Sequence, residues 1–163
     1  MSAGGKRVSQ RGLWFEEFEV GTVYEHKPGR TVTEADNVLF TTLTMNTQAL
    51  HLDAAWSAQQ PGFGGQRLIN SMFTLSTIVG LSVSQLTQGT LVANLGFSDI
   101  AFPHPLFAGD TLYAETECTG KRESSSRPGE GIVQITHIGR NQDGVIVAKA
   151  SRSTLVRLAP RES

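Results

Sequence analysis

The sequence INSMFTLSTIVGLSVSQL, residues 69–86, decides the fold, because it is long and apolar and contains no charged side chain. Its large apolar side chains recur at helical spacing, and small or amide side chains fill the positions between them. A helix without a charged face is enclosed by protein on most sides. We therefore predict a core helix over 69–86, against which the rest of the chain packs.

Downstream of this helix the apolar side chains alternate with polar ones, a pattern typical of strands. The predicted strands cover residues 91–100, 111–121, 131–140 and 145–157. The last two are joined by Asn141-Gln-Asp-Gly144, whose Asp-Gly pair suits a hairpin. Pro103 and Pro105 make the segment around them a crossing or an edge rather than a central strand.

Upstream of the core helix, the first ordered segment, 14–24, precedes a predicted turn at Lys27-Pro28-Gly29. A helix start follows, with Thr33 as the N-cap and an acid, Asp36, three residues later. We expect this helix to end near Met45-Asn46, because asparagine is tolerated at helix ends.

These elements predict an α+β fold, in which a long curved antiparallel sheet wraps around one apolar helix. The ends of the chain, 1–12 and 159–163, are small or polar, so we expect a flexible N-terminal arm and a flexible C-terminal end. Between them, residues 13–158 are predicted to form one domain, an ordinary size for a chain of 163 residues.

Composition excludes several classes of function. Fourteen basic and fifteen acidic residues give a net charge of −1, which disfavours nucleic-acid binding through bulk charge. The single cysteine, Cys118, excludes internal disulfides and a thiolate zinc cluster, and no histidine spacing supports a metal site. The uncharged stretch 68–98 is too polar to span lipid, and MSAGGKRVSQRG lacks the apolar segment of a secretory signal. We therefore expect a cytoplasmic protein with no membrane partner.

His51 is the main candidate for catalysis. It lies in a predicted loop between two helices, five residues after Asn46, and loops on a rigid scaffold often carry function. A hydrogen-bonded structural role remains an alternative for it. The other three histidines favour structural roles, because they precede a turn (His26), stand between prolines (His104) or belong to a strand (His137).

Two further segments offer groups for an anion. Free N–H groups at Asn70 and Ser71, where the core helix begins, suit a carbonyl oxygen or a developing oxyanion, although the same residues can simply cap the helix. The basic loop after the second of the four downstream strands contains Arg122, Ser124 and Arg127. It suits a phosphate or a carboxylate, or is a solvated turn.

Together, several segments resemble the MaoC-like hydratase/dehydratase family. They are TVTEADNVLF (31–40), LTMNTQALHLD (43–53), FGGQRLINSM (63–72) and FAGDTL (107–112). The similarity covers most of 13–156. It implies the hot-dog fold, a sheet wrapped around one long helix, which agrees with the fold predicted above.

The resemblance also assigns positions to the site. In this family an acid is followed five residues later by a histidine; here His51 takes the histidine position and Asn46 the acid position. Ser71 stands where the family has a glycine whose amide faces the thioester oxygen, and Asn70 precedes it. These departures resemble the branch of mesaconyl-CoA (β-methylmalyl-CoA) and itaconyl-CoA hydratases, and the loop at 122–128 is similar to that branch too.

This branch implies reversible addition of water to an enoyl-CoA thioester with a branched dicarboxylic acyl group. His51 would take a proton from water and return one to Cα, Asn46 would hold the water, and the Ser71 amide would stabilise the enolate. Arg67 is the candidate partner of the extra carboxylate. Arg122 and Arg127 are alternatives or contacts for the CoA phosphates.

Two other functions stay open, a hot-dog acyl-CoA thioesterase and a non-catalytic acyl-CoA-binding subunit. No cofactor is expected, because coenzyme A is part of the substrate. The family commonly dimerises, so we expect a homodimer or a higher homo-oligomer, with no metal and no nucleic acid.

Overall fold

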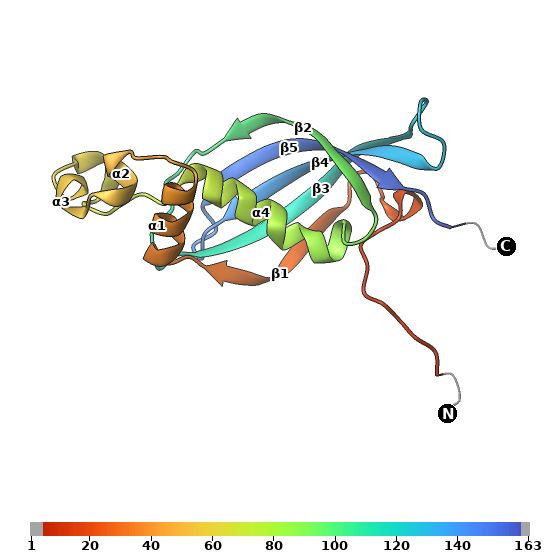
Figure 1. Ribbon diagram of the computed structural model, residues 1–163, viewed down its shortest axis with the longest axis horizontal. Helices are drawn as coiled ribbons and strands as arrows, with labels where there is room; N and C mark the ends of the chain where they lie inside the picture. Colours follow the sequence, from red (N-terminus) through yellow and green to blue (C-terminus); the bar gives the residue numbers. More distant parts are fainter. Residues whose placement is uncertain (1–4, 161–163) are drawn as a thin grey trace.

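In the computed structural model, which describes residues 5–160, one antiparallel sheet curves around a single long helix (Figure 1). In chain order the elements are η1 (Phe15–Glu17), β1 (Val23–Thr31), α1 (Glu34–Leu43), α2 (Ala49–Leu52), α3 (Ala54–Ser57), η2 (Pro61–Phe63), α4 (Ser71–Leu86), β2 (Leu91–Ala101), β3 (Thr111–Glu123), β4 (Glu130–Arg140) and β5 (Ile146–Arg157). The strands are ordered β1-β3-β4-β5-β2. The predicted α+β class is confirmed.

The helix α4 lies along the concave face of the sheet (Figure 1). It begins two residues after the predicted start, because the side chain of Asn70 accepts a hydrogen bond from the Met72 amide at 3.0 Å and so caps the helix. Ile78 is fully buried and packs against Gly139 of β4, where an added Cβ would lie 2.7 Å from the Ile78 side chain. The glycine therefore lets the helix approach the sheet closely.

The helix α1 begins as predicted. The side chain of Thr33 accepts from the Asp36 amide at 3.2 Å, and the Asp36 carboxylate accepts from the Thr33 amide at 2.9 Å. Its buried residues, however, are the polar Asn37 and Thr41, whereas the apolar Leu39 is 62% exposed. The inner face of α1 is therefore a hydrogen-bonding face.

Two local predictions were wrong. Lys27-Pro28-Gly29 is not a turn but part of β1, where the pairing with β3 shifts register between His26 and Arg30. An edge strand tolerates this proline because its missing N–H weakens the ladder least at an edge. His51 does not lie in a loop; it belongs to the short helix α2.

At the N-terminal end, the Gly12 amide donates to the Gln88 carbonyl, two residues beyond α4, at 2.7 Å, and the Leu13 amide donates to the carbonyl of Leu86, the last residue of α4, at 3.0 Å. The last residue of the predicted arm is thus held against the helix. The other ends of the two predicted flexible segments, 1–4 and 161–163, lie outside the described residues. Within 5–160, no helix is both long and apolar enough to cross a membrane.

A polar band crosses the interior between two apolar clusters. Thr116, between Ala114 of one cluster and Cys118 of the other, has its hydroxyl 2.7 Å from His26 Nε2 and 2.8 Å from His137 Nδ1. His137 is fully buried, and its Nε2 has no partner within the described residues. Burial, with the nearby Arg152 guanidinium and then His26, lowers the pKa of His137 from 6.5 to about 3.

Acid is therefore expected to destabilise the fold through His137. Between pH 6.5 and about 3 the unfolded chain binds a proton that the folded chain excludes. The free energy of unfolding should then fall with pH by up to about 1.4 kcal/mol per unit from this group. Urea unfolding across this range would measure the slope. Carboxylates titrate there too, so His137→Leu is the control, and an unchanged slope in that variant would contradict the assignment.

Candidate active site

His51 is buried but keeps one ring nitrogen free. Its residue is 7% exposed, and Nδ1 lies 2.8 Å from the carbonyl oxygen of Leu68. Because a carbonyl only accepts hydrogen bonds, Nδ1 carries the proton and Nε2 keeps its lone pair. Within residues 5–160 Nε2 makes no hydrogen bond. Unlike Nε2 of His137, it is not enclosed by protein atoms, so it retains contact with solvent. The contact with Leu68 therefore leaves Nε2 as the hydrogen-bond acceptor of the ring.

The buried side-chain amide of Asn37 holds the histidine segment, the short helix α2 that contains His51, against the start of α4. Its Nδ2 donates to the backbone carbonyls of His51 at 3.1 Å and of Leu68 at 3.0 Å. Its Oδ1 accepts from the Asn70 amide at 2.9 Å. One side chain from α1 therefore fixes three backbone groups, and Thr41 extends the cluster by accepting from the Asn70 side chain at 3.3 Å.

The sequence analysis missed Asn37 and Thr41 as site residues. Both are nearly inaccessible to solvent and stand four residues apart, on one face of α1. The signal in the sequence was a pair of hydrogen-bonding side chains at helical spacing, with the apolar residues 38–40 between them. It was masked by the apolar residues beside them, of which Leu39 and Leu43 face outward.

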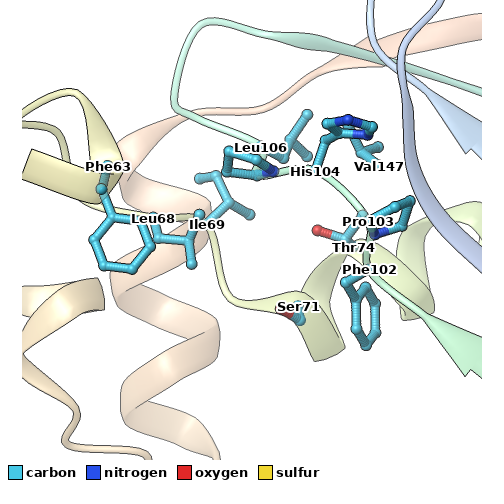
Figure 2. Close-up of a pocket in the computed structure, with 12 residues that line it drawn as sticks. Phe63, Leu68, Ile69, Ser71, Thr74, Phe102, Pro103, His104, Leu106 and Val147 are labelled. Carbon is cyan, nitrogen blue, oxygen red and sulfur yellow. The ribbon is translucent and has the colours of Figure 1, made fainter.

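The first turn of α4 borders a cavity. Ser71 is the first residue of the helix, and its amide has no acceptor within residues 5–160, whereas the next amide is capped by Asn70. The cavity has a volume of about 210 Å³ (Figure 2). Its lining includes Ser71, Thr74, His104 and the apolar side chains Phe63, Leu68, Ile69, Phe102, Leu106 and Val147. A carbonyl oxygen at Ser71 would have an acyl chain directed into an apolar space.

Some of the predicted site residues come together around Leu68. Its carbonyl binds His51, and only three residues, at most about 11 Å of extended chain, separate it from Ser71. Asn46 is half-buried, and its backbone amide donates to the Thr41 carbonyl at 2.9 Å. The hydroxyl of the same Thr41 accepts from the Asn70 side chain. Neither His51 nor Asn46 lines the 210 Å³ cavity itself; His51 contacts its lining through the Leu68 carbonyl.

Arg67 is already paired. Its Nη2 lies 2.7 Å from a carboxylate oxygen of Glu34, and its Nη1 donates to the Leu52 carbonyl at 3.3 Å. It does not line the cavity beside Ser71. In this arrangement Arg67 links α1 to α2, and its charge does not face the acyl space.

Arg122, Ser124 and Arg127 lie at the other end of the sheet. The start of β3 pairs with the end of β1, next to α1, and β3 then runs for thirteen residues, about 40 Å at 3.3 Å per residue. Arg122 is on the strand and donates to the Glu123 carbonyl at 3.5 Å, while Arg127 pairs with Glu130 at 2.9 Å. A single chain does not bring these residues to His51.

Within the described part of the chain, no three His, Cys, Asp or Glu side chains lie together as ligands of a metal ion would. The site consists instead of an imidazole, buried amides and a helix start. It can accept a proton at His51 Nε2 and donate a hydrogen bond from Ser71 to an oxygen.

Comparison with known proteins places the chain in a family. The MaoC like domain matches residues 16–141. The beta-methylmalyl-CoA dehydratase of Chloroflexus aurantiacus is 30% identical over 146 residues, which cover 90% of this chain and 40% of that protein. The mesaconyl-CoA hydratase of Cereibacter sphaeroides is 29% identical, with coverage of 90% and 41%. The chain thus spans about two fifths of the length of these curated relatives.

Solved structures agree with the sequence comparison. The X-ray structure described as a monoamine oxidase regulatory protein from Archaeoglobus fulgius matches with a TM-score of 0.81 at 30% identity. That match covers 94% of this chain and 100% of the other. The hot-dog fold that the resemblance implied is confirmed by such structural matches. The domain match, the relatives and the sheet wrapped around α4 lead to one conclusion: the chain belongs to the family of MaoC-like domains.

Proposed function

We propose that the protein is a hydro-lyase that adds water reversibly to the double bond of an enoyl-CoA thioester. The observation that carries this proposal is His51, whose Nδ1 is fixed by the Leu68 carbonyl while Nε2 is free. Leu68 stands three positions before Ser71, whose helix amide has no acceptor within residues 5–160. A base and an oxyanion donor on adjacent segments are what addition to a conjugated thioester requires.

The steps follow from these groups. His51 Nε2 takes a proton from water as the water oxygen bonds to Cβ, and the electron pair of the double bond moves onto the thioester oxygen. The Ser71 amide, at the positive end of α4, stabilises this enolate, an effect of about 3–4 kcal/mol in comparable sites. The His51 imidazolium then returns its proton to Cα. Asn46 cannot accept a proton, but its amide can hold the water.

The names of the curated relatives, a beta-methylmalyl-CoA dehydratase and a mesaconyl-CoA hydratase, support a thioester with a branched dicarboxylic acyl group as the substrate. Itaconyl-CoA is a second thioester of this class. The 210 Å³ cavity beside Ser71 favours a short acyl group of this kind over a long chain. No cofactor enters the proposed reaction, because coenzyme A arrives as part of the substrate.

A second copy of the chain is the partner that we propose. The edge strand β2 exposes Leu95, Phe97 and Ile100, which are 51%, 38% and 44% accessible. An apolar edge with free backbone groups is suited to pairing with another strand. In a homodimer, Arg122, Ser124 and Arg127 could contact the CoA phosphates of a substrate bound by the other copy. Light scattering that gives the mass of a single chain would contradict this proposal.

Purified protein assayed with mesaconyl-CoA, itaconyl-CoA and crotonyl-CoA tests the reaction. Hydration bleaches the conjugated enoyl absorbance without releasing thiol, and we expect this result with at least one of the three. A thioesterase would release free coenzyme A thiol in proportion to substrate consumed. A non-catalytic subunit would bind the thioesters, as calorimetry would show, with neither signal. Either of the last two results would overturn the hydratase assignment.

Asn46→Asp is expected to raise kcat by about tenfold or more, because a carboxylate at the position proposed to hold the water adds a second proton acceptor. The substitution keeps the side chain's size and the oxygen that accepts from the Gln48 amide at 3.2 Å. Steady-state hydration kinetics would measure the change, with Asn46→Ala as the control that removes both oxygen and nitrogen. If Asn46→Asp abolished turnover instead, the amide nitrogen itself would be required.

A further inference from the structure

We infer that His104 is the residue that recognises the distal carboxylate of the acyl group and so selects dicarboxylic over plain enoyl-CoA substrates. This inference rests on the proposed hydratase function, and it assigns a specificity role to a side chain outside the predicted catalytic set. The cavity beside Ser71 is the acyl space in this proposal, because a thioester carbonyl that accepts a hydrogen bond from the Ser71 amide directs its acyl chain into the cavity.

His104 is the one side chain of this lining that can carry a charge. The other side chains of the lining are aliphatic, aromatic, proline or hydroxyl groups, with Gly62 besides. His104 and the prolines on both sides of it are exposed, so a carboxylate that binds there stays partly hydrated while the rest of the acyl group enters apolar space. A cation or hydrogen-bond donor at this edge then favours a carboxylate over a methyl group. Arg67 does not serve, because it is paired with Glu34 and lies outside the lining.

The ring of His104 is held in place. Pro103 and Pro105 restrict the backbone on both sides, and Nδ1 lies 3.0 Å from the carbonyl oxygen of Ile146. The next residue, Val147, lines the same cavity, and Figure 2 shows both residues at its border. The rigid segment that suggested a structural role thus fixes an imidazole at the acyl space.

The hydrogen bonding of this imidazole defines its ligand. The Ile146 carbonyl can only accept, so Nδ1 keeps its proton. Nε2 makes no hydrogen bond within residues 5–160 and is free to bind a second proton. A carboxylate beside Nε2 stabilises that proton and accepts a charge-assisted hydrogen bond from it. An acyl chain that ends in a methyl group forms no such bond.

The test compares two thioesters that differ only at the far end of the acyl chain. Mesaconyl-CoA carries the carboxylate, and 2-methylbut-2-enoyl-CoA has a methyl group in its place. His104→Leu is expected to lower kcat/KM for mesaconyl-CoA by about fivefold, the size for an exposed charge pair, and to leave the value for the methyl substrate within about twofold. His104→Arg, which keeps a cation, is expected to retain the preference for the carboxylate.

Phe63→Leu is the matched control, because Phe63 lines the same cavity without a charge and should change both substrates by the same factor. An equal loss for both substrates in His104→Leu, or no loss for either, would overturn the inference. If the unmodified protein hydrates neither of these thioesters, nor itaconyl-CoA, nor crotonyl-CoA, the proposed function is wrong. The dissociation constants of the two thioesters, compared between the unmodified protein and His104→Leu, then still decide whether His104 binds the carboxylate.

Discussion

The His51→Ala protein is expected to lose at least about a thousandfold in kcat for hydration while keeping its fold. The imidazole is the only base in the proposed reaction, and general acid–base catalysis contributes about 10²–10⁴ in comparable enzymes. Because His51 both takes and returns the proton, removal affects both halves of the reaction. The decrease should appear in kcat more than in KM, since Ser71 and the acyl cavity remain.

His51→Gln provides the matched control for this experiment. Its amide can still donate to the Leu68 carbonyl, which the ring contacts at 2.8 Å, but it cannot accept a proton from water. Both variants should therefore be inactive, and His51→Gln should unfold at nearly the same temperature as the unmodified protein. Turnover retained in either variant would show that another group activates the water.

Asn37→Ala is expected to lower the free energy of unfolding by about 3 kcal/mol or more and to reduce hydration strongly. The substitution leaves the His51 carbonyl and the Asn70 amide without their partner, and each buried unpaired group costs about 1–3 kcal/mol. The Leu68 carbonyl loses one of its two donors and keeps His51 Nδ1. The histidine segment then loses its link to α4. Thermal unfolding should occur at least about 6 °C lower in a domain of this size.

The control lies on the same helix. Leu39→Ala removes a side chain that is 62% exposed, so it should change the stability by no more than about 0.5 kcal/mol. Asn37→Asp distinguishes the hydrogen bond that the side chain accepts from the two that it donates. Its carboxylate still accepts from the Asn70 amide but repels the carbonyls of His51 and Leu68. If Asn37→Ala were as stable and active as Leu39→Ala, the amide would not position the site.

The sequence predicted the elements that depend on local chemistry. The uncharged segment that became α4, the capping box at Thr33 and the strand pattern all act within a few residues, so propensity and periodicity are sufficient to find them. The turn expected at Lys27-Pro28-Gly29 failed because the pairing of β1 with β3, a contact between distant segments, overrides a local turn signal.

The site was only partly predictable for the same reason. The family resemblance placed His51 and Ser71, but the amide that joins their segments comes from α1, and no spacing rule connects Asn37 to Asn70. The pairing of Arg67 with Glu34 is likewise a long-range contact. The position of Arg122 depends on the length of β3 and on its pairing, which carry it to the opposite end of the sheet from α1.

The polar band through Thr116 gives the interior two compartments that pack separately. The cavity beside Ser71 is lined in part by Ile69 and Leu106, which belong to one apolar cluster. Phe18 and Leu86 belong to the other cluster and do not line it. Reshaping the cavity for a different acyl group therefore loosens packing in one compartment and leaves the second intact. The cavity and the second compartment can therefore change independently of each other.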